Sequence, residues 1–144
     1  MNEVQLEGFL RRIVQLTPEH QPKFGKMNVH QMVCHCTDQL RLSLGMIKAD
    51  DNYTLIDPSV VKNLALAKKP VPTPKGLGQV EGDGTSPTTF ENDKALLKSH
   101  LLEFLNLPED FDYAPHPYFG KSDRKSWMAI TIYHLDHHLS QFNA

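Results

Sequence analysis

Apolar residues recur at helical spacing in four long stretches of this chain, and no stretch alternates as a half-buried strand would. The first stretch, residues 2–16, ends before Thr17-Pro18, because the residue before proline disfavours helical geometry. Its apolar positions follow the i, i+3, i+4, i+7 pattern of one helix face: Leu6, Phe9, Leu10 and Ile13. Such a face must be buried against other helices, so the pattern predicts an all-α domain.

Capping signals predict where the later helices begin. Asn28, followed three residues later by Gln31, is typical of a capping box and predicts a helix from there to about Ile47. The sequence Thr-Thr-Phe-Glu at 88–91 has the same pattern and predicts a third long helix, which Pro108 closes. Residues 108–121 form an aromatic, proline-containing loop. Ser122 is expected to cap a fourth long helix that runs to the end of the chain.

Residues 50–89 interrupt the helical pattern. Asp57-Pro58 predicts a short helix to about Lys68, and the prolines and glycines of residues 70–84 indicate irregular backbone. Because a long connection can carry the chain across a bundle, the helices before and after it can run parallel. The predicted fold is therefore a four-helix bundle with one long crossover. The glycosylation sequon at 52–54 is expected to be unused, since no secretion signal accompanies it.

A chain of 144 residues has room for one buried core, so we expect a single domain over residues 1–144. The net charge of −2 provides no basic surface, and neither nucleic acid nor a membrane is an expected partner. No apolar run is long enough to span a bilayer, and the acidic first residues do not form a signal peptide. A cytoplasmic location is the resulting expectation. Cys34 and Cys36 diverge on one helix, which disfavours a disulfide.

Three of the eight histidines lie close together on the final predicted helix, at positions 134, 137 and 138. At about 100° per residue, His134 and His138 are one turn apart on the same face, whereas His137 points elsewhere. One helix commonly supplies two ligands to a divalent metal through such an i, i+4 pair. The alternative is a purely structural cluster, because buried ring nitrogens also need hydrogen-bond partners.

His35 is the best candidate for a third metal ligand. It lies in the middle of the second predicted helix, at the edge of the apolar stripe, where helical bundles build internal sites. Asp38, one turn later, either orients a ligand by accepting a hydrogen bond or is an exposed helix charge. Cys34 and Cys36 share no face with His35, and Cys36 is expected in the core.

The other histidines are weaker candidates. His30 is in the first turn of its helix and is predicted to face solvent. His20 in a turn and His116 in a loop are also predicted to be exposed. His100 lies near the apolar stripe of the third helix and competes weakly for a role. His137 is expected to make surface contacts or to contact a ligand from outside.

The end of the chain resembles a known family. The sequence His-Pro-Tyr-Phe-Gly at 116–120, then Trp127, then the histidine-rich residues 134–142 are similar to the closing signature of a bacterial subfamily of the DinB-like superfamily. Residues 57–63 and 69–72 resemble its middle segment, so the likeness covers most of the chain. The resemblance implies a DinB-like four-helix bundle with parallel neighbouring helices, and a homodimer.

The resemblance also implies a metal site. Members hold a divalent ion, often nickel or zinc, by a histidine on the second helix and a His-x-x-x-His pair on the fourth. The matching positions are His35, His134 and His138, which helical spacing selects independently.

Three neutral imidazoles leave a divalent ion with open positions, as a catalytic site needs. Such an ion lowers the pKa of bound water or of a thiol. The resemblance implies transferases and isomerases that use low-molecular-weight thiols, so thiol S-transfer to a small-molecule substrate is the leading hypothesis.

A metal-dependent hydrolase would need the same ligands. A binding or stress-response module without catalysis is the alternative from another class. Residues 111–120 and the Gly/Pro-rich stretch are expected at the pocket rim.

Overall fold

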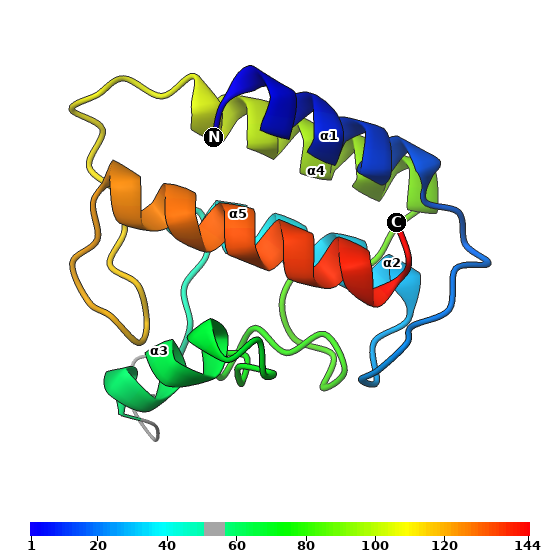
Figure 1. Ribbon diagram of the computed structural model, residues 1–144, viewed down its shortest axis with the longest axis horizontal. Coiled ribbons are helices and arrows are strands. Elements are labelled where there is room, and N and C mark those ends of the chain that lie inside the picture. Colours follow the sequence, from blue (N-terminus) through cyan, green and yellow to red (C-terminus); the bar gives the residue numbers. More distant parts are fainter. Residues whose placement is uncertain (51–56) are drawn as a thin grey trace.

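The computed structural model describes residues 1–50 and 57–144, and these residues form five helices and no strand (Figure 1). Their bounds are Glu3–Gln15 for α1, Val29–Ser43 for α2, Pro58–Leu66 for α3, Phe90–Leu105 for α4 and Arg124–Gln141 for α5. The all-α prediction is confirmed for these residues, in which one isolated β-bridge joins His116 and Gly120. None of these helices is both long and apolar enough to cross a membrane. The sequon at 52–54 lies outside the described residues.

The four long helices pack against one another. Both α1 and α2 contact α4 and α5. Figure 1 shows that α2 and α4 run in the same direction and that α1 and α5 run in the opposite one. The crossover therefore connects two parallel neighbours, α2 and α4, as its length suggested. In Figure 1, α3 and the green loop that follows it lie on the side of the molecule away from α1 and α4.

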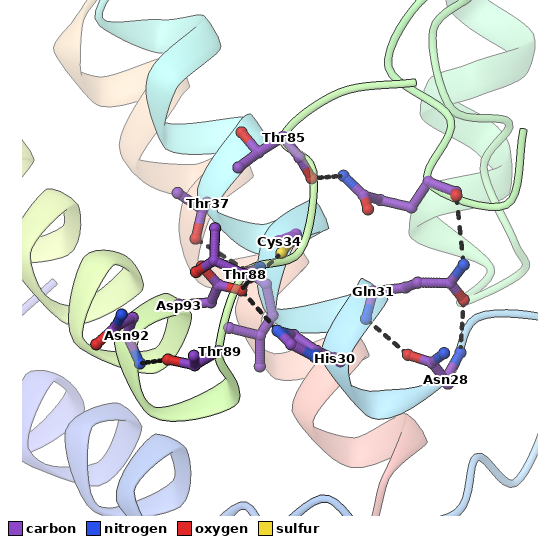
Figure 2. Close-up of polar contacts among 12 residues, drawn as sticks. Asn28, His30, Gln31, Cys34, Thr37, Thr85, Thr88, Thr89, Asn92 and Asp93 are labelled. Carbon is purple, nitrogen blue, oxygen red and sulfur yellow. Dashed lines mark hydrogen bonds and ion pairs between the residues drawn. The ribbon is translucent and has the colours of Figure 1, made fainter. Parts of the chain in front are cut away.

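Local hydrogen bonds explain where α2 begins and ends. The Asn28 side chain accepts from the Gln31 amide at 2.8 Å, and the Gln31 side chain accepts from the Asn28 amide at 2.9 Å, which is the predicted capping box (Figure 2). The helix ends at Ser43, four residues earlier than predicted. Gly45 adopts φ 73°, and the amides of Gly45 and Met46 donate back to carbonyls of the last turn. This arrangement is a Schellman motif, which stops the helix.

Two predicted caps are wrong. The N-cap of α4 is Thr89 and not Thr88. Thr88 donates its amide and its hydroxyl to the carboxylate of Asp93, at 2.7 and 2.8 Å, so it is not free to cap the helix. The N-cap of α5 is Asp123, one residue after the predicted Ser122. Aspartate at this position also places a negative charge at the positive end of the helix dipole.

The core lies between α1, α2, α4 and α5. Trp127 on α5 is fully buried, and its indole Nε1 donates to the carbonyl of Ala114 at 2.9 Å. This bond fixes the aromatic loop against α5. The largest fully buried side chains around it are Phe104, Phe142, Ile13, Leu16, Met32, Leu40, Leu97, Leu101, Leu135 and Leu139.

Asp38 has neither of the roles predicted for it. Its carboxylate is buried and accepts the Thr85 amide at 3.0 Å and the Gln79 side-chain amide at 2.9 Å. The Thr85 hydroxyl donates to it as well. Gly84 approaches so closely that a Cβ there would lie 2.3 Å from the carboxylate. Asp38 thus attaches the returning end of the crossover to α2.

We expect Asp38→Ala to lower the free energy of unfolding by about 3 kcal/mol, because it leaves buried donors of Thr85 and Gln79 without an acceptor. Urea unfolding followed by circular dichroism measures this. Asp83→Ala is the matched control, since Asp83 is an exposed aspartate of the same segment. Equal stability of the two variants would show that Asp38 does not hold the crossover.

Candidate metal centre

Helices α2 and α5 bring the three predicted ligands together. His35 comes from α2, and His134 and His138 come from successive turns of α5. One ring nitrogen from each of the three lies within 4.8 Å of the others. The ring centroids are 4.5 to 4.7 Å apart, and the Nε2 atoms of His35 and His134 are separated by 2.9 Å. We call this group the histidine trio.

Burial makes the trio neutral. His35 and His138 are each 8% exposed. Burial lowers the pKa of His35 to about 4. It also lowers the pKa of His134 and of His138 well below the usual 6.5, and the neighbouring imidazoles add to the effect. Neutral imidazole, with a free lone pair, is the form of histidine that binds a metal.

Gln141 orients His138. The Nδ1 atom of His138 lies 2.9 Å from the Gln141 side-chain oxygen, an acceptor, so Nδ1 carries the proton and Nε2 presents a lone pair. The Gln141 side-chain nitrogen donates to the carbonyl of Phe24 at 2.7 Å, which fixes the amide in this orientation. A Cβ on Gly25 would lie 2.8 Å from that nitrogen, so glycine permits the contact. Metal-binding histidines are usually held by a partner of this kind.

The spacing of the trio is close to that which a divalent ion requires. Nδ1 of His134 is buried and has no hydrogen-bond partner among the described residues. The Nε2 atoms of His35 and His134 face each other at 2.9 Å, and one proton between them makes a hydrogen bond. Two nitrogen ligands of a tetrahedral ion lie about 3.3 Å apart, so an ion requires these rings to separate by only a few tenths of an ångström.

A second polar contact between α2 and α5 lies next to the trio. Gln39 follows His35 by one turn, Thr131 precedes His134 by almost one turn, and the Gln39 side-chain nitrogen donates to the Thr131 hydroxyl at 3.2 Å. The Gln39 side-chain oxygen is buried and lacks a partner in the described part of the chain. Because a buried unpaired acceptor is costly, this oxygen is available to a donor entering the site.

His137 lies outside the trio, in the direction that helical spacing predicted. Its ring stacks with Tyr133 at 5.9 Å between centroids and lies 5.4 Å from Phe24. His137 is also half-buried. Its ring also lies 4.9 Å from that of His138 between centroids, but no His137 nitrogen belongs to the trio, so this residue serves as a control position for tests of the trio.

Three histidines predicted to face solvent are half-buried instead. His20 accepts the amide of Thr17 at 3.1 Å. His116 packs its ring 5.1 Å from that of Trp127, and burial lowers its pKa to about 4. His30 lies 2.6 Å from the carboxylate of Asp93. These predictions were wrong because the segments that cover the three rings are distant in sequence or irregular in structure.

His100 lies outside the histidine trio. Its Nδ1 lies 3.0 Å from the carboxylate of Glu103, one turn later on α4. The contact is local, and His100 has no role in the candidate metal centre.

The sequence interpretation missed a second group with metal-binding atoms. His30, Cys34 and Asp93 place their ligand atoms within 4.8 Å of one another. The i, i+4 spacing of His30 and Cys34 was a usable signal, but Asp93 comes from α4 and could not be assigned to it. Both Cys34 and Cys36 are buried free thiols, and the core position expected for Cys36 is confirmed. Burial and the nearby Asp93 raise the pKa of Cys34 to about 12.

The chain belongs to the family described as "Protein of unknown function (DUF1569)", which matches residues 4–144. No curated protein matches the chain, and neither does any solved structure. The family description names no activity, so the function has to be inferred from the site.

Proposed function

We propose that this DUF1569 protein holds a divalent transition metal, nickel or zinc, through His35, His134 and His138, and transfers the sulfur of a low-molecular-weight thiol to a small electrophile. The convergence of three neutral imidazoles from two helices supports the metal site. The DinB-like resemblance supports the four-helix-bundle class and the choice of a thiol.

The residues around the trio suit this role. Gln141 keeps the Nε2 lone pair of His138 directed inward, and packing in the core fixes the helix that carries His134. Three protein ligands leave a divalent ion with an open position, where it would act as a Lewis acid that lowers the pKa of a bound thiol. The unpaired oxygen of Gln39 offers a hydrogen-bond acceptor to a substrate N–H or O–H group.

Conjugation of a low-molecular-weight thiol to a chromogenic aryl halide tests the reaction. We expect the nickel- or zinc-loaded protein to raise the rate above that of the same ion in buffer, and His134→Ala to remove the increase. The metal-free protein and His137→Ala are the controls. Without conjugation by metal-loaded protein for several thiols and electrophiles, the transferase proposal fails, and a non-catalytic metal-binding module becomes the better description. An increase that persists in His134→Ala also contradicts it.

A further inference from the structure

We infer that α2 carries a second metal site on the face directed toward α4, in which His30, Cys34 and Asp93 hold a zinc-like divalent ion. The trio binds on the α5 side of the same helix, so the two sites are separate. This inference does not rest on the proposed function of the trio.

Figure 2 shows the three side chains converging. His30 Nε2 lies 2.6 Å from the Asp93 carboxylate, and Cys34 Sγ lies 3.7 Å from the same oxygen. His30 and Cys34 are one turn apart on α2, which holds a nitrogen and a sulfur donor on one rigid face. Asp93 in the first turn of α4 completes a set of three different donor atoms.

Thr88 fixes the orientation of the Asp93 carboxylate. Thr88 donates its amide to Oδ2, the oxygen that His30 and Cys34 also contact, and its hydroxyl to Oδ1, at 2.7 and 2.8 Å. These bonds do not use His30 or Cys34, so an ion that replaces the contacts of those two residues does not have to break them. In metal sites a ligating carboxylate usually also accepts hydrogen bonds from residues that do not bind the metal, because these bonds fix the orientation of the carboxylate.

An ion can reach this group from solvent. The His30 side chain is 26% exposed, whereas that of Asp93 is 5% exposed. His30 also lines a cleft of about 230 Å³ together with Pro18, Pro22 and Phe90. Of the three members, Asp93 is therefore enclosed by protein and His30 borders the cleft, and three protein ligands leave a fourth position for water or an external ligand.

The donor set selects the ion. A thiolate with an imidazole and a carboxylate favours zinc or cobalt(II), whereas magnesium and calcium prefer oxygen ligands alone. Binding breaks the Sγ–H bond of Cys34, forms the sulfur–metal bond and releases that proton to solvent. The metal replaces the proton on Nε2 of His30, that proton leaves to solvent, and in the bound state the proton of the ring is on Nδ1. The 2.6 Å contact between His30 and Asp93 widens as the ion enters.

Cobalt(II) is the probe, because a thiolate ligand produces a sulfur-to-cobalt charge-transfer band that an all-histidine site lacks. The titration uses the folded His134→Ala/His138→Ala chain, from which the trio is removed. We expect this band to appear and to saturate at about one ion per chain. Absence of the band in this chain and in the unaltered protein would overturn the inference and show that His30, Cys34 and Asp93 form only a hydrogen-bonded group.

Two cysteine variants provide the matched comparison. Cys34→Ser should abolish the band, whereas Cys36→Ser should retain it, because Cys36 Sγ lies 3.7 Å from Met32 Sδ and outside the group. His30→Gln should weaken cobalt binding at least about tenfold. Because His30 is partly exposed, this variant tests the site even if a substitution at the buried Cys34 disturbs folding. If the band survives in Cys34→Ser, or is lost from folded Cys36→Ser, then Cys34 is not the sulfur ligand and the proposed site is refuted.

Discussion

Replacing His138 by alanine is expected to abolish metal binding at the trio, while replacing its neighbour His137 is expected to leave it intact. His138 supplies an inward lone pair that Gln141 orients, and the remaining two imidazoles cannot hold an ion as tightly. We expect the affinity for zinc to fall at least about a hundredfold, which corresponds to about 2.7 kcal/mol of binding free energy. Calorimetric titration in a Cys34→Ser background isolates the trio from the second proposed site.

His137→Ala is a close control, because it removes an imidazole from the same helix at the position next to His138. Its ring contacts those of Tyr133, Phe24 and His138, but none of its nitrogens belongs to the trio. An affinity that falls equally in both variants, or only in His137→Ala, would show that the ligand assignment is wrong. Circular dichroism of both variants establishes that the helices are retained.

Acid is expected to destabilise the metal-free protein strongly. The folded-state pKa values of His35, His134 and His138 are below the unfolded value of about 6.5. Above about pH 6.5 these histidines are neutral in both the folded and the unfolded chain, so the free energy of unfolding does not change with their titration. Below it the unfolded chain takes up protons that the folded chain does not, so stability decreases by up to about 1.4 kcal/mol per pH unit for each histidine. For His35 the decrease continues to about pH 4.

Urea unfolding between about pH 7 and pH 5 measures this slope. His35→Gln replaces one titrating ring by a side chain that does not titrate. The slope of the free energy of unfolding against pH should therefore decrease by about the contribution of one proton. The imidazoles of His116 and His137 also have lowered pKa values and contribute to the remaining slope. A slope that is the same in His35→Gln and in the unaltered chain would contradict the neutral, buried state of His35.

The helices and the trio were readable from the sequence because both depend on local spacing. Apolar periodicity predicted the long helices, and the i, i+4 rule placed His134 and His138 on one face. The position of His35 within the second helix was enough to select it as the third member. The capping box at Asn28 was also predictable, because its hydrogen bonds join residues three apart.

The long-range contacts could not be predicted in the same way. Asp38 is buried only because the crossover returns Thr85 and Gln79 to α2, and an irregular segment gives no periodic signal for its path. Asp93 similarly accepts from Thr88 instead of leaving that residue to cap α4. The hydrogen-bond partners of a carboxylate depend on the tertiary structure. A single sequence therefore does not distinguish an aspartate that is exposed from one that is buried as a hydrogen-bond acceptor.

The central claim is that His35, His134 and His138 together bind one divalent ion. Elemental analysis of the Cys34→Ser protein, purified without an affinity tag and then titrated with zinc and nickel, tests it most directly. The predicted result is about one equivalent of ion per chain, lost when His35 is replaced by alanine. Less than about a tenth of an equivalent, with no uptake during titration of the folded protein, would contradict the claim.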